Sequence, residues 1–122
     1  MIRRSEQKII QPVFPVSGTT KIFLSQYALL TPKQLKEDQN PPFAELIQRY
    51  HLQQTGNGEY ALCGFIKTDA SFQATQLEAK GIQLTPPAAD FRTVCIPLKL
   101  LEYFFSQPGI IYFENTMTVN PL

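Results

Sequence analysis

Between residues 59 and 114 the chain reads as strand, helix, strand, strand, helix, strand, and this order limits the fold more than any other feature. Four short apolar runs are bounded by glycine, proline or polar turn residues, as is typical of β-strands. These runs cover residues 60–67, 82–85, 91–96 and 110–114. Crossover connections within a sheet have a preferred right hand, so few topologies accommodate this order.

Two helices are predicted between these strands. In the first, Asp69 or Ser71 caps the amino end, Leu77 lies on the apolar face and Gly81 ends the helix. The second helix begins at Pro97, and its apolar residues recur at helical spacing. We expect an α+β fold, a ferredoxin-like βαββαβ open-faced sandwich with strand order 4-1-3-2 and both helices on one face of an antiparallel sheet. The layer between helices and sheet is expected to contain Ile66, Leu77, Val94, Leu98 and Leu101.

The sheet face opposite the helices is predicted to be apolar as well. Residues 110–113 are apolar at every position and residues 60–66 nearly so, whereas a solvated face would alternate apolar with polar side chains. A large apolar surface needs a cover. Three covers remain open: the N-terminal residues 1–54, a second copy of the chain, or a different protein.

The chain divides into an N-terminal, partly helical extension (1–54), a core (55–114) and a C-terminal tail (115–122). The extension begins with an extended arm over residues 1–20, which contains a short strand at 13–16.

Two short helices are predicted later in the extension. Thr31 and Gln34 match a capping box, with Pro32 at the first helical position. A second helix opens at Pro42, and Phe43 begins its apolar residues at helical spacing.

The composition excludes several classes of function. A chain of 122 residues suits one domain. Eleven Lys and Arg against ten Asp and Glu leave a net charge of +1, which provides no basic face for nucleic acid. No apolar run reaches the roughly 18–20 residues that span a membrane, and the polar residues after Met1 show no secretory signal in this chain.

Residues for catalysis or metal binding are scarce. The sequence has one histidine, His51, and no Cys-x-x-Cys pair, Gly-x-Ser-x-Gly motif or phosphate-binding glycine loop. We therefore expect no metal, no cofactor, no small-molecule substrate and no enzymatic activity of the isolated domain. Cys63 and Cys95 are expected on neighbouring strands, on the face opposite the helices, as free thiols.

Residues 60–114 resemble the propeptide of secreted bacterial subtilisin-like serine proteases. The resemblance lies in the order and spacing of CGFIKT at 63–68, LEAKGIQL at 77–84, TVCIPLKLLE at 93–102 and QPGIIYFE at 107–114. These stretches resemble the family's first strand, the end of its first helix with the second strand, and then the third strand, second helix and fourth strand. Both cysteines depart from the family, in which small or polar residues are usual at those positions.

The resemblance implies a binding function. Such propeptides lay the open sheet face on two parallel surface helices of the protease, and act first as intramolecular chaperones and then as inhibitors. An acidic side chain commonly caps the amino ends of those helices, where N–H groups are unpaired. Asp90 and Glu114 are the candidates for this role. The implied partner is the catalytic domain of a protease in the same precursor, and the implied location is secreted or periplasmic.

The C-terminal tail is predicted to enter the protease cleft. After Glu114 it contains no glycine and no charge, so it can extend as an added strand whose side chains fill alternate pockets. If the chain is cleaved after Leu122, that residue fills the first pocket, Pro121 the second and Val119 the fourth. The residues expected in the cleft are Thr118, Val119, Asn120, Pro121 and Leu122.

Two other functions remain open. A free-standing inhibitor of the same fold would act in trans on a protease encoded elsewhere. A ferredoxin-like regulatory or oligomerisation domain would expose a small-molecule pocket or form a dimer through the open face. Sizing the chain alone and with a subtilisin separates this last class from the two inhibitors.

Overall fold

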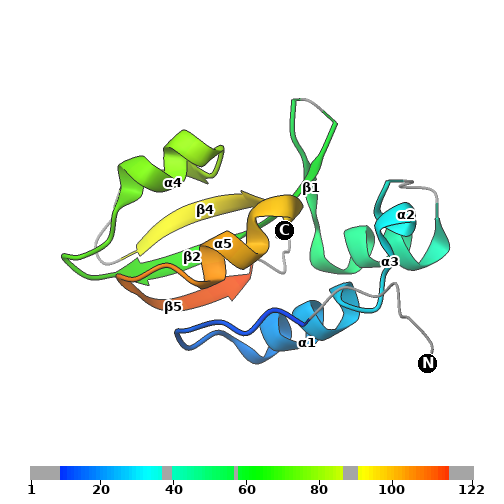
Figure 1. The fold of residues 1–122 in the computed structure, drawn as a ribbon, viewed down its shortest axis with the longest axis horizontal. Coiled ribbons are helices and arrows are strands. Elements are labelled where there is room, and N and C mark those ends of the chain that lie inside the picture. The colour runs from blue at the N-terminus through cyan, green and yellow to red at the C-terminus, as the bar shows by residue number, and fades with distance from the viewer. Residues whose placement is uncertain (1–8, 37–39, 57, 87–90, 116–122) are drawn as a thin grey trace, which may run out of the picture.

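The computed structural model describes residues 9–36, 40–56, 58–86 and 91–115, and every structural statement below concerns these residues. Helices precede the sheet in the chain and then alternate with its strands (Figure 1). The helices are α1 (Gly18–Tyr27), α2 (Pro32–Leu35), α3 (Pro41–Tyr50), α4 (Ala74–Lys80) and α5 (Leu101–Phe105), with a 3-10 turn, η1 (Leu98–Leu100), before α5. The strands are β1 (Gln53–Gln54), β2 (Tyr60–Thr68), β3 (Gln83–Leu84), β4 (Phe91–Pro97) and β5 (Ile110–Asn115).

The five strands form one antiparallel sheet around β2. β2 pairs with β4 on one side and with β5 on the other, and β3 pairs with β4. β1 pairs with the start of β2, on the side away from β4. The chain is therefore α+β with an open antiparallel sheet, as predicted. Its strand order differs slightly from the predicted 4-1-3-2, because residues 53–54 add a strand that the hydrophobic pattern does not indicate.

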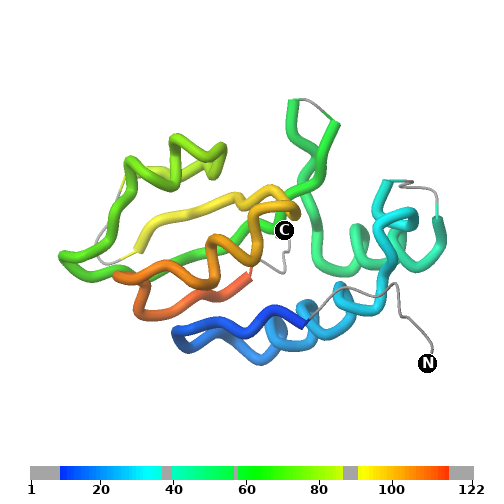
Figure 2. The backbone as a smooth tube through the Cα atoms, viewed as in Figure 1, coloured from blue at the N-terminus to red at the C-terminus, as the bar shows by residue number. Residues whose placement is uncertain are grey.

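A hairpin turn explains the additional strand β1. The Thr55 N–H donates to the carbonyl of Glu59 at 2.6 Å and closes the turn that links β1 to β2. Gln53 and Gln54 are polar and exposed, so no apolar periodicity identifies them as a strand. The hairpin projects from the sheet beside the N-terminal helices (Figure 2).

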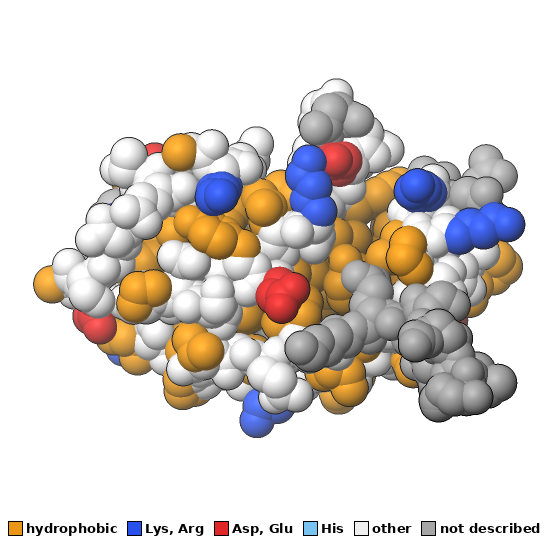
Figure 3. Space-filling model, viewed as in Figure 1, with side chains coloured by type: hydrophobic (Ala, Val, Ile, Leu, Met, Phe, Trp, Pro, Cys, Tyr) orange, Lys and Arg blue, Asp and Glu red, His pale blue; other side chains and the backbone are white. Residues whose placement is uncertain are grey.

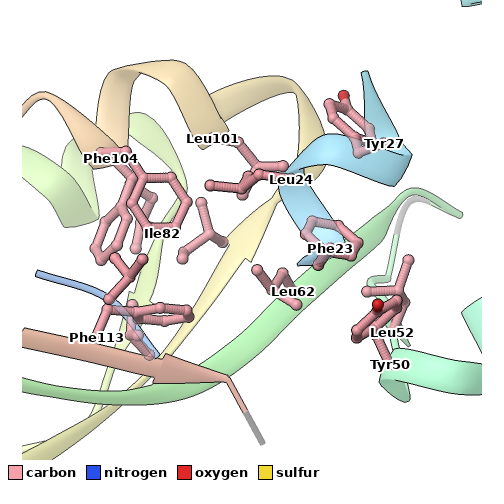
Figure 4. Packing of buried hydrophobic residues seen from close by; sticks show 14 of the residues in the cluster. Phe23, Leu24, Tyr27, Tyr50, Leu52, Leu62, Ile82, Leu101, Phe104 and Phe113 are labelled. Atoms are coloured by element: carbon pink, nitrogen blue, oxygen red, sulfur yellow. The ribbon is translucent and has the colours of Figure 1, made fainter. Parts of the chain in front are cut away.

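Alternate residues of the strands point toward the helices and form the core. Leu62 lies opposite Ile96, Ile66 lies opposite Phe113, and all four are fully buried. The helices and the segment before β3 complete this layer with Leu77, Ile82, Leu101, Phe104 and Phe105. Figure 4 shows Leu101, Phe104 and Ile82 directed into the same space as Leu62 and Phe113. Of the five residues predicted for this layer, four are buried and Leu98 is partly buried.

Residues 18–27 form the helix α1, so the extended arm ends before residue 18 and not at residue 20 as predicted. Ser17 caps the helix, because its backbone is extended (φ −66°, ψ 159°) and its hydroxyl accepts a hydrogen bond from the Thr20 N–H at 3.3 Å. The buried residues of α1 recur every three or four positions: Thr20, Phe23, Leu24 and Tyr27. This spacing is helical, and the prolines of the arm all precede it. The predicted C-terminal limit of the arm, residue 20, is therefore wrong.

The segment before α1 lies along the outer edge of β5. The Ser17 N–H donates to the Phe113 carbonyl at 2.9 Å, and the Phe113 N–H donates to the Pro15 carbonyl at 3.2 Å. These bonds make Val16 a parallel bridge partner of Phe113. The predicted strand at residues 13–16 is reduced to this single bridge, which covers part of an edge that would otherwise be open to pairing.

α2 and α3 form where the sequence predicts them. Thr31 and Gln34 form the predicted capping box, with bonds of 3.2 Å and 2.8 Å between each backbone N–H and the other's side chain. α3 buries Phe43 and Tyr50, and the Tyr50 hydroxyl donates to Gln26 Oε1 at 2.9 Å. Residues on both sides of the expected 54/55 boundary belong to one hydrophobic cluster.

α4 begins later than predicted. Neither Asp69 nor Ser71 caps it, because the Ser71 N–H and hydroxyl donate to Asp69 Oδ1 at 2.8 Å and 2.7 Å within a preceding turn. The helix starts at Ala74, after Gln73. Gly81 ends it in the left-handed conformation (φ 113°), as predicted.

Candidate binding face

The sheet side opposite the helices carries a second set of side chains. Directly opposed residues of antiparallel strands share a face, so the strand register identifies this set. We call this surface the open face, and it consists of Cys63, Phe65, Lys67, Phe91, Thr93, Cys95, Tyr112 and Glu114. All eight are partly or fully exposed, whereas Leu62, Gly64 and Ile66, which alternate with them along β2, are buried.

The described part of the N-terminal extension does not cover the open face. Its buried side chains belong to the cluster on the helix side of the sheet. Phe65 remains 44% exposed and Phe91 48% exposed. Of the N-terminal cover considered from the sequence, the described residues 9–36 and 40–54 leave these side chains exposed.

Aromatic side chains and one lysine make up one end of the open face. Lys67 lies directly opposite Phe91 on one side and Tyr112 on the other. Its ammonium lies 5.8 Å from the centre of the Phe91 ring, a cation–π distance. Phe65 lies between Thr93 and Glu114 in the register. The arrangement presents flat apolar surface with a positive group within it and a carboxylate beside it.

A disulfide joins Cys63 and Cys95 in the middle of the open face. The prediction of free thiols is therefore wrong, whereas their predicted position on neighbouring strands and on this face is confirmed. The two residues are directly opposed, with Cα atoms 4.0 Å apart, in the closer class of antiparallel pairs. Only the register reveals this opposition, since the cysteines are 32 residues apart in sequence.

Two adjoining hollows lie beside this disulfide. The larger, about 410 Å³, is lined by His51, Gln53, Thr55, Ala61, Cys63, Gln83 and Cys95. The smaller, about 310 Å³, shares Cys95 and Gln83 and extends to Gly81, Lys80 and Lys99. The β1–β2 hairpin and β3 therefore wall the open face at the disulfide, a feature that no sequence motif signals.

Among the site residues predicted from the sequence, Glu114 belongs to the part of the chain that the structure describes. It lies exposed near the end of β5, on the open face and directly opposite Phe65. Asp90 and the cleft residues Thr118, Val119, Asn120, Pro121 and Leu122 lie outside the described residues.

The residue after Glu114 ties the end of β5 to the N-terminal extension. Asn115 is 2% exposed, and its Oδ1 accepts hydrogen bonds from the hydroxyls of Thr19 at 2.7 Å, Thr20 at 2.8 Å and Ser17 at 3.3 Å. Its N–H donates to the Thr20 hydroxyl at 3.3 Å. Sequence reasoning misses this role, because Asn115 reads as the first polar residue of the tail.

A separate cavity of about 760 Å³ lies on the helix side, between α2, α3 and η1. Aromatic and aliphatic side chains line it, with an ion pair between Lys99 and Glu59 (3.1 Å) at its border. Figure 3 shows hydrophobic surface in this region, between the β1–β2 hairpin and α2.

The described residues contain few features of catalytic chemistry. They include no group of three His, Cys, Asp or Glu side chains placed to hold a metal ion. Asp69 lies in an exposed turn, where hydrogen bonds lower the pKa of its carboxyl. The Ser71 hydroxyl makes the larger contribution and the Ser71 N–H the smaller. Among the helices of the described segments, none has the length and apolar character to cross a membrane.

Comparison with known proteins identifies no relative. No family model matches the chain, and neither a curated protein nor a solved structure matches it.

Proposed function

We propose that the chain is the prodomain of a subtilisin-like serine protease, which assists folding of the catalytic domain and then inhibits it until cleaved. The observation that carries this proposal is the open face. It presents Phe65, Phe91 and Tyr112 on a sheet whose other face is already buried, and the described N-terminal residues leave it uncovered. A surface of this kind is typical of a protein-binding site.

The proposal includes a ferredoxin-like core. Two observations support this core: strands and helices follow one another in the predicted order between residues 60 and 115, and β2 pairs with both β4 and β5. In this description β1 and the helices α1 to α3 are additions to the βαββαβ unit. The additions attach at the β5 edge and at the end of the sheet, so the open face keeps its access.

The chemistry of the open face suits two surface helices of a protease. The aromatic rings bury apolar area against the helix sides, which supplies most of the affinity. Glu114 projects from the same face, where its carboxylate can accept hydrogen bonds from the unpaired N–H groups of a helix amino end. We propose the same role for Asp90.

Residues 118–122 then block the active site. An extended segment in a protease cleft forms main-chain hydrogen bonds, and its alternate side chains fill pockets. Leu122 is proposed for the first pocket, Pro121 for the second and Val119 for the fourth. The anchoring of Asn115 to α1 supports this role, because it holds the point from which the tail departs.

The disulfide bears on the location. Disulfides persist in oxidising compartments and are rare in the cytosol. The Cys63–Cys95 bond is compatible with a secreted or periplasmic protein, which is the location we propose.

The test is inhibition in trans. The purified chain is titrated against three subtilisin-like proteases, with a chymotrypsin-like protease as the control enzyme. We expect stoichiometric, competitive inhibition of at least one subtilisin and none of the control. Phe65→Asp and Phe91→Asp should each weaken it at least about tenfold, because a carboxylate would be buried in an apolar interface.

A matched control separates the open face from exposed apolar residues in general. Ile22 on α1 is 52% exposed, so Ile22→Asp adds the same charge elsewhere and should inhibit like the parent. The prodomain proposal is contradicted if the chain inhibits none of the subtilisins. It is also contradicted if gel filtration shows a dimer that Phe65→Asp dissociates. The dimer would identify the oligomerisation domain instead.

A further inference from the structure

We propose that the Cys63–Cys95 disulfide is a thiol–disulfide exchange site, which a small dithiol reduces while the protein stays folded. Both cysteines depart from the propeptide pattern, and the geometry of the open face carries this proposal independently of the proposed function. The sulfur atoms are accessible from solvent, and the core does not depend on their bond.

Access comes from the position of the disulfide. Both cysteines are half-buried and point to the uncovered face of the sheet. Both line the 410 Å³ hollow, and Cys95 also lines the adjoining 310 Å³ hollow. A small thiol can therefore approach the bond from solvent without separating β2 from β4. Most structural disulfides are protected because such an approach requires unfolding.

The core does not depend on this bond. β2 and β4 are held by seven consecutive residue pairs, of which Cys63–Cys95 is one. The side chains that bury the sheet, among them Leu62, Ile66, Val94 and Ile96, lie on the opposite face. Reduction removes a cross-link from the exposed side and leaves those contacts unchanged. We therefore expect the reduced chain to keep its secondary structure.

The hollows give access to both sulfur atoms. Exchange requires approach along the S–S axis, from the side opposite the leaving sulfur. On the β3 side, Gln83 lies directly opposite Cys95, and both residues line both hollows. On the other side, the β1 pairing ends at Ala61 and the β5 pairing begins at Gly64, so no strand of the described residues pairs with Cys63 there. Either sulfur can therefore be attacked.

The chemistry balances with a dithiol as the reductant. One thiolate of the dithiol attacks one of the two Sγ atoms, the S–S bond breaks, and the other cysteine departs as a thiolate. The second thiol of the reagent then attacks the reagent's sulfur in the mixed disulfide, closes a cyclic disulfide and releases the attacked cysteine as a thiolate. Two electrons pass to the protein, and the two cysteine thiolates take up the two protons that the dithiol loses.

His51 lines the same hollow as Cys63 and Cys95. Lys80 and Lys99 line the adjoining hollow, but Lys99 pairs with Glu59 at 3.1 Å and the Lys80 ammonium lies 5.2 Å from the centre of the Tyr103 ring.

The decisive experiment is reduction of the folded chain by dithiothreitol at several urea concentrations below the unfolding transition. Thiols are counted with a chromogenic reagent, and far-ultraviolet circular dichroism reports the fold. We expect two thiols per chain, an unchanged spectrum and a rate that stays flat with urea. A rate that rises exponentially with urea from zero denaturant would show that reduction needs unfolding, and would overturn the proposal. Loss of the spectrum on reduction would overturn it too.

A variant tests approach through the hollows. Gln83→Trp places a large ring opposite Cys95 at an exposed position and should slow reduction several-fold. Gln76→Trp makes the same change at an exposed position of α4 and should leave the rate as in the parent. Equal rates for the two variants, with circular dichroism unchanged, contradict approach through the hollows.

The two proposals fail separately. Failure to inhibit any subtilisin contradicts the prodomain function and leaves native-state reduction as measured. A urea-dependent rate contradicts the exchange site and leaves inhibition as measured. Where both hold, a protease docked on the open face covers the disulfide, so reduction should be slower in the complex than in the free chain. This last consequence rests on the proposed function, and equal rates would place the protease elsewhere on the surface.

Discussion

Gly64 lies where β5 approaches β2 too closely for a side chain. A Cβ atom built there would meet the Glu114 carbonyl oxygen, and would lie 2.8 Å from Asn115 Cα and 2.9 Å from the Phe113 ring. Two of these neighbours are backbone atoms, which cannot turn aside as a flexible side chain could. The glycine therefore permits the β2–β5 pairing that brings Glu114 and Asn115 to their positions.

Gly64→Ala is expected to destabilise the chain by about 1–3 kcal/mol, because the added methyl group overpacks this contact. Gly56→Ala is the matched control, since nothing lies within 4 Å of its Cβ position and its φ is not positive. The free energy of unfolding in urea decides the comparison. Equal values for the two variants would show that β5 can move away from Gly64 at no cost.

Ser71 holds the pKa of Asp69 below its ordinary value by donating hydrogen bonds to the carboxylate. We expect Ser71→Ala to raise this pKa, although only in part, because the N–H of residue 71 remains a donor. A lowered folded-state pKa stabilises the fold above the unfolded pKa, and the contribution is lost as the pH falls through the folded pKa. Carbon-detected NMR titration of the Asp69 carboxyl measures the shift. Ser25→Ala, whose hydroxyl donates to the Ile22 carbonyl, should leave it unchanged.

Among the elements, α1 and β5 depend on one another. The chain before α1 pairs with Phe113, and the hydroxyls of Ser17, Thr19 and Thr20 converge on the Asn115 side chain. Asn115 and Thr20 are the buried polar residues among those described. The Thr20 hydroxyl donates a hydrogen bond to Asn115 Oδ1 and accepts one from the Asn115 N–H. A helix that follows the arm thus braces the last strand of the sheet.

Asn115→Ala should cost about 1–3 kcal/mol of folding free energy, because it leaves the buried Thr20 hydroxyl without this partner. Gln48→Ala removes an exposed amide from α3 and should change stability by less than about 0.5 kcal/mol. Thermal unfolding followed by circular dichroism distinguishes the two. A midpoint for Asn115→Ala equal to that of Gln48→Ala would mean that the brace contributes nothing.

Over the whole molecule, folding and inhibition are expected to reside in different parts. The described residues bury their apolar side chains in one cluster. The open face supplies the broad contact with a protease, while the tail excludes substrate from the catalytic serine. Deletion of one part should therefore leave the other intact.

Deleting residues 117–122 should leave the circular dichroism spectrum unchanged and weaken inhibition of a subtilisin by roughly tenfold or more, because tail binding adds to binding of the face. Leu122→Asp should act in the same direction, since it would bury an unpaired carboxylate in an apolar pocket. Leu29→Asp, at a residue that follows α1 and is 67% exposed, is the control for added charge. If both tail variants inhibit like the parent, the inhibitory element is the open face or the N-terminal extension.

Local chemistry determined the elements that the sequence alone predicts. The three longest strands follow from short apolar runs between turn residues, the capping box of α2 from Thr31 and Gln34, and the end of α4 from Gly81. Burial of Leu77 and Leu101 follows from helical spacing. Each of these features depends on residues within a few positions of one another, so the linear sequence contains all the information they need.

Tertiary structure alone decided which surfaces stay exposed and which distant residues meet. The Cys63–Cys95 bond, the hollows beside it and the Asn115 brace join segments between 32 and 98 residues apart. The course of residues 15–17 along β5 is of the same kind. Such contacts depend on strand register, and a shift of one residue would turn every side chain of a strand to the other face. Periodicity predicts that a strand has two faces, but only the pairing of the strands determines which residues share each face.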